Sequence, residues 1–105
     1  MNRYRITKAD EIYAAEFRRN LDTGNSYHSP GLQRVLNVMR GGPKAGKYVL
    51  ITREPFKRWV LARLPEGRGE AIEILRRHQF TDLKDAEWAV FKLRWRDQTG
   101  RALDL

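Results

Sequence analysis

The sequence contains no cysteine. This absence excludes disulfide bonds, thiolate metal sites and cysteine nucleophiles together. Long apolar runs are also missing, because no stretch approaches the roughly 20 apolar residues that a transmembrane helix needs. The first residues, MNRYRITKADE, carry charges where a signal peptide needs its apolar region. We therefore expect a cytoplasmic protein that does not bind membranes.

Acidic residues are in short supply. The chain has 13 Asp and Glu against 21 Lys and Arg, which gives a formal net charge of +8. Such an excess is compatible with nucleic acid, an anionic membrane surface or an acidic protein face as the partner. The basic residues are scattered, and Arg18-Arg19 and Arg76-Arg77 come nearest to a run. The charge alone therefore does not choose among these partners.

The length of 105 residues predicts a single domain over 1–105. We expect its ordered core at 28–96 and a loosely ordered tail at 97–105. In the N-terminal part, Thr7 is a candidate N-cap with Asp10 in capping-box spacing, and a loosely amphipathic helix follows to about residue 20. The polar stretch DTGNSYHS at 22–29 predicts a loop.

A second helix is the clearest element of the sequence. Ser29 is its predicted cap, Pro30 occupies the first helical position, and the glycines and proline at 41–43 end it. Its apolar residues recur at i, i+3, i+4 and i+7, which predicts one buried stripe. These residues are Leu32, Val35, Leu36 and Met39.

The C-terminal part predicts a small antiparallel sheet and a last helix. Runs at 48–52 and 59–64 alternate with period two and predict a hairpin, and 71–75 is our candidate third strand. A helix capped by Thr81 or Asp82 follows and runs to about residue 96. It carries one apolar stripe of Leu83, Ala86, Val90 and Leu93 and an aromatic stripe of Trp88, Phe91 and Trp95. We therefore predict an α+β fold with two N-terminal helices, a sheet of about three strands, and a C-terminal helix packed on the sheet.

One stretch resembles a nucleotide-binding motif but departs from it. Residues 41–47 fit the first seven positions of the phosphate loop G-x-x-x-x-G-K, whereas the eighth, which should be Ser or Thr, is Tyr48. The order of elements is also reversed, because a phosphate loop follows a strand and opens a helix. The stretch predicts the end of a helix and a turn into a strand.

No set of residues forms a recognisable catalytic or metal site. His28 and His78 lie in or beside predicted loops without metal-ligand spacing, so we expect two exposed bystanders. Asp82 and Asp85 are interpreted as helix caps, and Ser26 and Ser29 have no evident base. We predict no catalytic residue, metal ligand or cofactor in this chain, which by itself does not have the residues of an enzyme.

The remaining sequence feature that bears on function is a set of aromatic residues interleaved with basic residues. They are compatible with stacking on nucleic-acid bases, with burial in the core, or with a protein–protein interface, where Trp, Tyr and Arg are enriched. The surplus apolar face of the last helix favours the interface. The predicted partner-contact residues are Arg34, Tyr48, Arg53, Trp59, Trp88, Phe91 and Trp95.

The central part of the chain resembles the small subunit of N,N-dimethylformamidase. The resemblance rests on Ser29-Pro30, Leu32-Gln33-Arg34-Val35, Asn37, Arg40, Pro43 and Gly46-Lys47-Tyr48. It continues more loosely at Thr52-Arg53-Glu54 and returns at Phe80 and at AEWAVFK, residues 86–92.

The resemblance implies a hydrolase, an amidohydrolase for small N-substituted amides or ureas built as a hetero-oligomer of large and small subunits. In that family the large subunit carries a mononuclear iron held by tyrosine and glutamate side chains, and no catalytic residue carries over to the small one. It implies that this chain stabilises the large catalytic subunit. In isolation the chain is then expected to be inactive and to be poorly soluble or partly disordered.

Two alternatives stay open. Arg34, Tyr48 and Arg53 can instead lie near a substrate passage. A small basic nucleic-acid-binding module using exposed aromatics is the other function that the composition allows, and its affinity would fall steeply with ionic strength.

Overall fold

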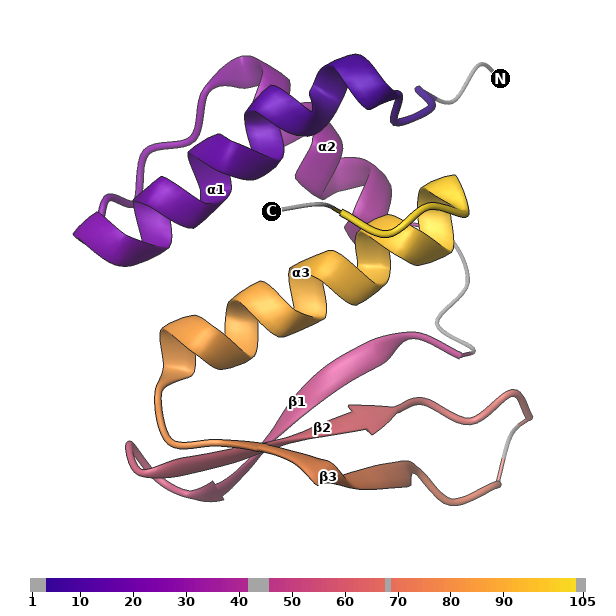
Figure 1. Cartoon of the computed structure of the whole chain (residues 1–105). Helices are drawn as coiled ribbons and strands as arrows, with labels where there is room; N and C mark the ends of the chain where they lie inside the picture. The colour runs from indigo at the N-terminus through magenta and orange to yellow at the C-terminus, as the bar shows by residue number, and fades with distance from the viewer. Residues whose placement is uncertain (1–3, 42–45, 68, 104–105) are drawn as a thin grey trace. The chain divides into compact units, whose positions relative to one another are not determined.

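Three α-helices and a three-stranded sheet make up the part of the chain that this computed structural model describes, residues 4–41, 46–67 and 69–103 (Figure 1). The predicted α+β class is confirmed. The chain divides into two compact units, Met1–Gly42 with Trp95–Leu105 and Pro43–Arg94. We call them the helical unit and the sheet unit. The prediction of a single domain stays a prediction.

The helical unit begins with a 3-10 turn, η1 (Lys8–Asp10), that leads directly into α1 (Glu11–Thr23). The predicted capping arrangement is present, because the Thr7 N–H donates to Asp10 Oδ2 over 2.8 Å. Helix α1 runs three residues beyond the predicted end. It stops at Gly24, whose φ of +72° is the left-handed conformation that commonly ends helices.

Helix α2 (Pro30–Arg40) starts and ends as predicted. Ser29 Oγ accepts a hydrogen bond from the Leu32 N–H at 3.2 Å, and Gly41 ends the helix. The predicted stripe is confirmed, since Leu32, Val35, Leu36 and Met39 are all buried. A Cβ atom at Gly31 would clash with the Tyr13 ring, so the glycine lets the α1 tyrosine ring lie against α2.

The sheet unit contains β1 (Tyr48–Glu54), β2 (Arg58–Arg63) and β3 (Glu73–Phe80), which pair antiparallel in the order β1-β2-β3. A helix precedes β1, which agrees with the prediction that residues 41–47 are the end of a helix and a turn into a strand and not a phosphate loop. Residues 42–45 of that stretch lie outside the described residues. In the register, Leu61 on the central strand lies opposite Leu50 and Leu75. Because paired residues share a face, these three side chains lie on one side of the sheet.

The third antiparallel strand is confirmed, but its bounds differ from the predicted 71–75. It begins two residues later than predicted and extends to Phe80, and Ile72 lies before it and is 45% exposed. The pairing moves from Leu61↔Leu75 to Val60↔Gln79, so residues 76–78 form a bulge on the β3 side. A bulge breaks the two-residue alternation of apolar and polar side chains that marks a strand. The sequence pattern therefore does not show that the charged residues after position 75 belong to an edge strand.

Helix α3 (Leu83–Thr99) belongs to both units, with residues up to Arg94 in the sheet unit and Trp95 onward in the helical unit. The Lys84 N–H donates to Asp82 Oδ1 at 2.8 Å, which confirms Asp82 as a cap. The helix ends at Gly100, φ +74°, so residues 97–99 of the predicted tail are helical.

One stripe of α3 packs on the sheet, as predicted (Figure 1). Val90 forms a buried cluster with Tyr48 and Leu61, and Leu93 packs against it. The prediction that Leu83 is the first member of this stripe is wrong, because Leu83 lies in the first turn of the helix and is 41% exposed.

Candidate functional site

A polar cluster ties the start of the chain to α2. Asp10 is 3% exposed, and its Oδ2 accepts a hydrogen bond from Tyr4 Oη at 2.5 Å. Burial raises the pKa of the Asp10 carboxyl, but the hydrogen bonds from Tyr4 and Thr7 outweigh it and hold that pKa below its ordinary value. The same hydrogen bond raises the pKa of the Tyr4 phenol.

Arg34, a predicted partner contact, lies over this cluster. Its guanidinium carbon is 3.9 Å from the centroid of the Tyr4 ring, and Nη2 lies 3.8 Å from Asp10 Oδ1. The Arg34 side chain remains 48% exposed. It therefore makes cation–π and ionic contacts within the helical unit and still presents surface to solvent.

A second polar cluster joins α1 to the start of α2. Glu16 Oε1 accepts from Ser29 Oγ at 2.5 Å, and Oε2 accepts from the Ser29 N–H at 2.8 Å. Burial raises the pKa of Glu16, and the two hydrogen bonds from Ser29 outweigh this effect and lower it. Asn20 Nδ2 donates to Tyr27 O at 2.8 Å and lies 3.1 Å from His28 Nδ1.

A serine beside a carboxylate and a histidine invites comparison with a nucleophile and its base. Here the Ser29 hydroxyl donates to Glu16 and accepts from the Leu32 N–H, so it is engaged as a helix cap. The described contact of His28 Nδ1 is to Asn20, not to Ser29. A nucleophile needs a base in contact with its hydroxyl and a reaction face open to substrate. The cluster is therefore a structural clamp.

Sequence reasoning missed this clamp and was wrong about His28. His28 is half-buried, with its ring centroid 6.1 Å from that of Phe17, because the loop folds back onto α1. His78 is exposed, as predicted, but it lies in β3. Glu16 and Ser29 are 13 positions apart, and neither helical nor strand spacing relates them.

The two lowered carboxyl pKa values predict a loss of stability in acid. The ordinary values are 3.8 for Asp10 and 4.5 for Glu16, so their stabilisation is complete above these values and is lost as pH falls through the lowered folded-state pKa. We expect thermal melts to shift downward below about pH 4. Asp10→Asn and Glu16→Gln should each flatten that pH dependence, followed by circular dichroism. The exposed Asp97→Asn is the control, and an unchanged profile in both test variants would contradict the prediction.

The structure buries four of the predicted partner contacts. Tyr48 is 9% exposed, Trp88 7%, Phe91 3% and Trp95 1%. The rings of Trp88 and Phe91 stack with centroids 5.4 Å apart. These side chains offer little surface to another protein in this conformation, and equally little to nucleic-acid bases.

The other predicted contacts in the sheet unit retain surface. Trp59 is half-buried, and Arg53 is exposed near the end of β1. The backbone at the start of β1 is used within the unit, because Arg94 Nη2 donates to Tyr48 O at 2.9 Å and Arg63 Nε donates to Gly46 O at 2.9 Å. The partner-contact set as a whole stays a prediction.

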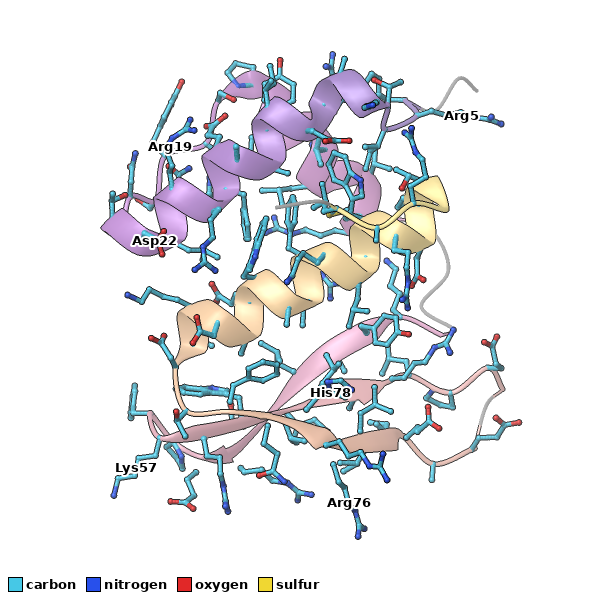
Figure 2. All side chains as sticks on the ribbon, in the orientation of Figure 1. Arg5, Arg19, Asp22, Lys57, Arg76 and His78 are labelled. Carbon is cyan, nitrogen blue, oxygen red and sulfur yellow. The ribbon has the colours of Figure 1, made fainter. Side chains whose placement is uncertain are left out.

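Two exposed features of the sheet unit are not among the predicted partner contacts. Residues 76–78, Arg-Arg-His, are exposed on the β3 bulge, and the Arg76 side chain extends from the sheet on the side away from α3 (Figure 2). Phe56 in the β1–β2 turn is 94% exposed. The sequence signal for this exposed side chain is a phenylalanine directly after Pro55 in a predicted turn.

Within the described ranges, no group of three or more His, Cys, Asp or Glu side chains is placed to hold a metal ion. None of the described helices combines the length and the apolar composition that a membrane span requires.

A family model described as the N,N-dimethylformamidase alpha subunit matches residues 3–103 of the 105-residue chain. The match includes both polar clusters, the whole sheet and α3. A search of the curated proteins finds no match to this chain.

Proposed function

The chain belongs to the N,N-dimethylformamidase alpha subunit family, and we propose that it is the small, non-catalytic subunit of a cytoplasmic, iron-dependent amidohydrolase acting on small N-substituted amides. The family implies a multi-subunit enzyme with partner subunits. The proposal goes further. It assigns the iron and the reaction to a large partner subunit and assigns to this chain the task of stabilising that partner.

The non-catalytic role is supported by one observation: the serine and carboxyl groups that could react make hydrogen bonds within the fold. Ser29 is a helix cap held by Glu16, and Asp10 is held by Tyr4 and Thr7. Each group makes hydrogen bonds that fix the backbone of the helical unit, so changing its protonation during a reaction would destabilise the fold.

Among the residues that the structure describes, no donor set fits the expected iron. Tyr4 and Asp10 form a hydrogen-bonded tyrosine–carboxylate pair, and the Arg34 guanidinium carbon lies 3.9 Å from the tyrosine ring centroid. A cation at that distance opposes a second positive charge, and a single tyrosine and a single carboxylate are too few ligands. Bound in the large subunit, iron would polarise the amide carbonyl or activate water.

The proposal is tested by co-expressing the tagged chain with the large subunit encoded in its own genome. We expect one complex of fixed stoichiometry that contains iron and hydrolyses N,N-dimethylformamide, whereas the purified chain alone shows no hydrolysis. Mass spectrometry, metal analysis and amide turnover on the same fractions are the measurements.

Three results would contradict the proposal. The first is turnover by the chain alone at a rate comparable with that of the complex. The second is iron that stays with the isolated chain after the large subunit is removed. The third is recovery of the chain at low salt with nucleic acid and without the large subunit, which would favour the nucleic-acid-binding alternative.

A further inference from the structure

The tip of the β1–β2 hairpin presents an aromatic side chain to solvent. Phe56 is 94% exposed, the most exposed of the large hydrophobic residues in the described chain. Tyr27 at 67% and Ile12 at 65% follow it, and both lie in the helical unit. A phenylalanine with this exposure gains nothing from burial in its own fold.

The backbone at Phe56 also has a conformation that the residue disfavours. Its φ of +61° makes it the one non-glycine residue with positive φ in the described chain. The Lys57 N–H donates to Glu54 O at 3.0 Å, which closes a four-residue turn with Pro55 second and Phe56 third. Glycine or asparagine is the usual residue where φ is positive at that position. The chain therefore carries backbone strain at a residue whose ring makes little contact with the fold.

The tip is held in place from both sides. The Pro55 ring fixes φ at the second turn position, and Arg58 Nη2 pairs with Glu54 Oε1 across the turn at 3.0 Å. A side chain presented by a rigid turn loses less conformational freedom when it binds than one on a mobile loop.

Basic residues flank Phe56 in the sequence, and they are exposed. Arg53, Lys57 and Arg58 flank the turn against the single acid Glu54, and the Lys57 side chain projects outward from it (Figure 2). A complementary surface would have an apolar pocket for one ring and carboxylates around it. Basic residues at the rim and an aromatic at the centre are the pattern of an anchor residue at a protein interface.

We propose that Phe56 anchors this chain in an apolar, acid-rimmed pocket on the large subunit of the amidohydrolase. The inference rests on the proposed function for the identity of the partner. Burial of the ring in that pocket would offset the backbone strain at Phe56, which contacts within the free chain do not offset.

Competitive incorporation tests the anchor in the assembled enzyme. The large subunit is co-expressed in limiting amount with wild-type and Phe56→Gly chains, and the ratio of the two in the purified complex is read by mass spectrometry. Glycine accepts positive φ, so the variant should melt at the same temperature as the wild-type chain or higher. It should nevertheless be depleted from the complex on the order of thirtyfold, as expected for a hot-spot residue.

Two matched variants complete the design. Tyr27→Ala removes another exposed aromatic side chain and should incorporate as well as the wild-type chain. Phe56→Tyr keeps an aromatic ring at the tip and should recover most of the incorporation.

The outcomes separate the anchor from the proposed function. Failure of the wild-type chain to enter any complex overturns the proposed function and the anchor together. Equal incorporation of Phe56→Gly and wild type overturns the anchor and leaves the function standing. Equal depletion of Tyr27→Ala and Phe56→Gly also overturns it, because loss of any exposed aromatic would then have the same effect.

Discussion

Replacing Trp95 by alanine is expected to lower the free energy of unfolding by about 3–5 kcal/mol. Trp95 is 1% exposed and is the largest of the fully buried side chains in the described chain. The substitution removes the whole indole ring and leaves a cavity that close-packed neighbours fill only in part. For a chain of 105 residues, whose total stability is of the order of 5–15 kcal/mol, this is a large share.

Pulse proteolysis of the tagged chain across a urea series measures this loss at concentrations too low for aggregation. Phe56→Ala is the control, because a residue that is 94% exposed should change stability by no more than about 0.5 kcal/mol. A Trp95→Ala chain that unfolds at the wild-type urea concentration would contradict the burial of this ring. It would favour the sequence-based prediction that Trp95 contacts a partner.

The aromatic residues of α3 show what periodicity can and cannot determine. The spacing of Trp88, Phe91 and Trp95 correctly predicts one helical stripe, and all three side chains are buried. Spacing does not identify the atoms that cover a stripe. These can belong to the same chain or to another one, and that choice depends on contacts between residues far apart in sequence.

Local rules account for the elements that were predicted well. The bounds of α2 follow from Ser29, Pro30 and Gly41, which act within one turn of the helix, and the hairpin follows from alternation in adjacent segments. The clamp between Glu16 and Ser29 spans 13 positions and the hydrogen bond from Arg34 to Tyr4 spans 30, and no local rule pairs them. The β3 bulge cannot be predicted from the sequence pattern, because its charged residues interrupt the alternation of apolar and polar side chains that marks a strand.

Leu61→Ala is the second substitution with a large expected effect, about 2–5 kcal/mol. Leu61 is 1% exposed on the central strand and lies in the cluster with Tyr48 and Val90. Its cross-strand neighbours are Leu50 and Leu75, which pack against the same cluster. Truncating it therefore weakens all three strands and their contact with α3, which the same proteolysis assay measures.

The same variant tests whether the two units unfold as one domain. Helix α3 is continuous through Arg94 in the sheet unit and Trp95 in the helical unit, and a 17-residue helix without its packing surface is marginally stable in water. Melting of the sheet unit should therefore release α3 and with it Trp95. In the Leu61→Ala chain we expect amide hydrogen exchange to accelerate in α2 as much as in β2, although the substitution lies outside the helical unit. Faster exchange confined to residues 43–94 would show that the units unfold independently and would contradict the single-domain prediction.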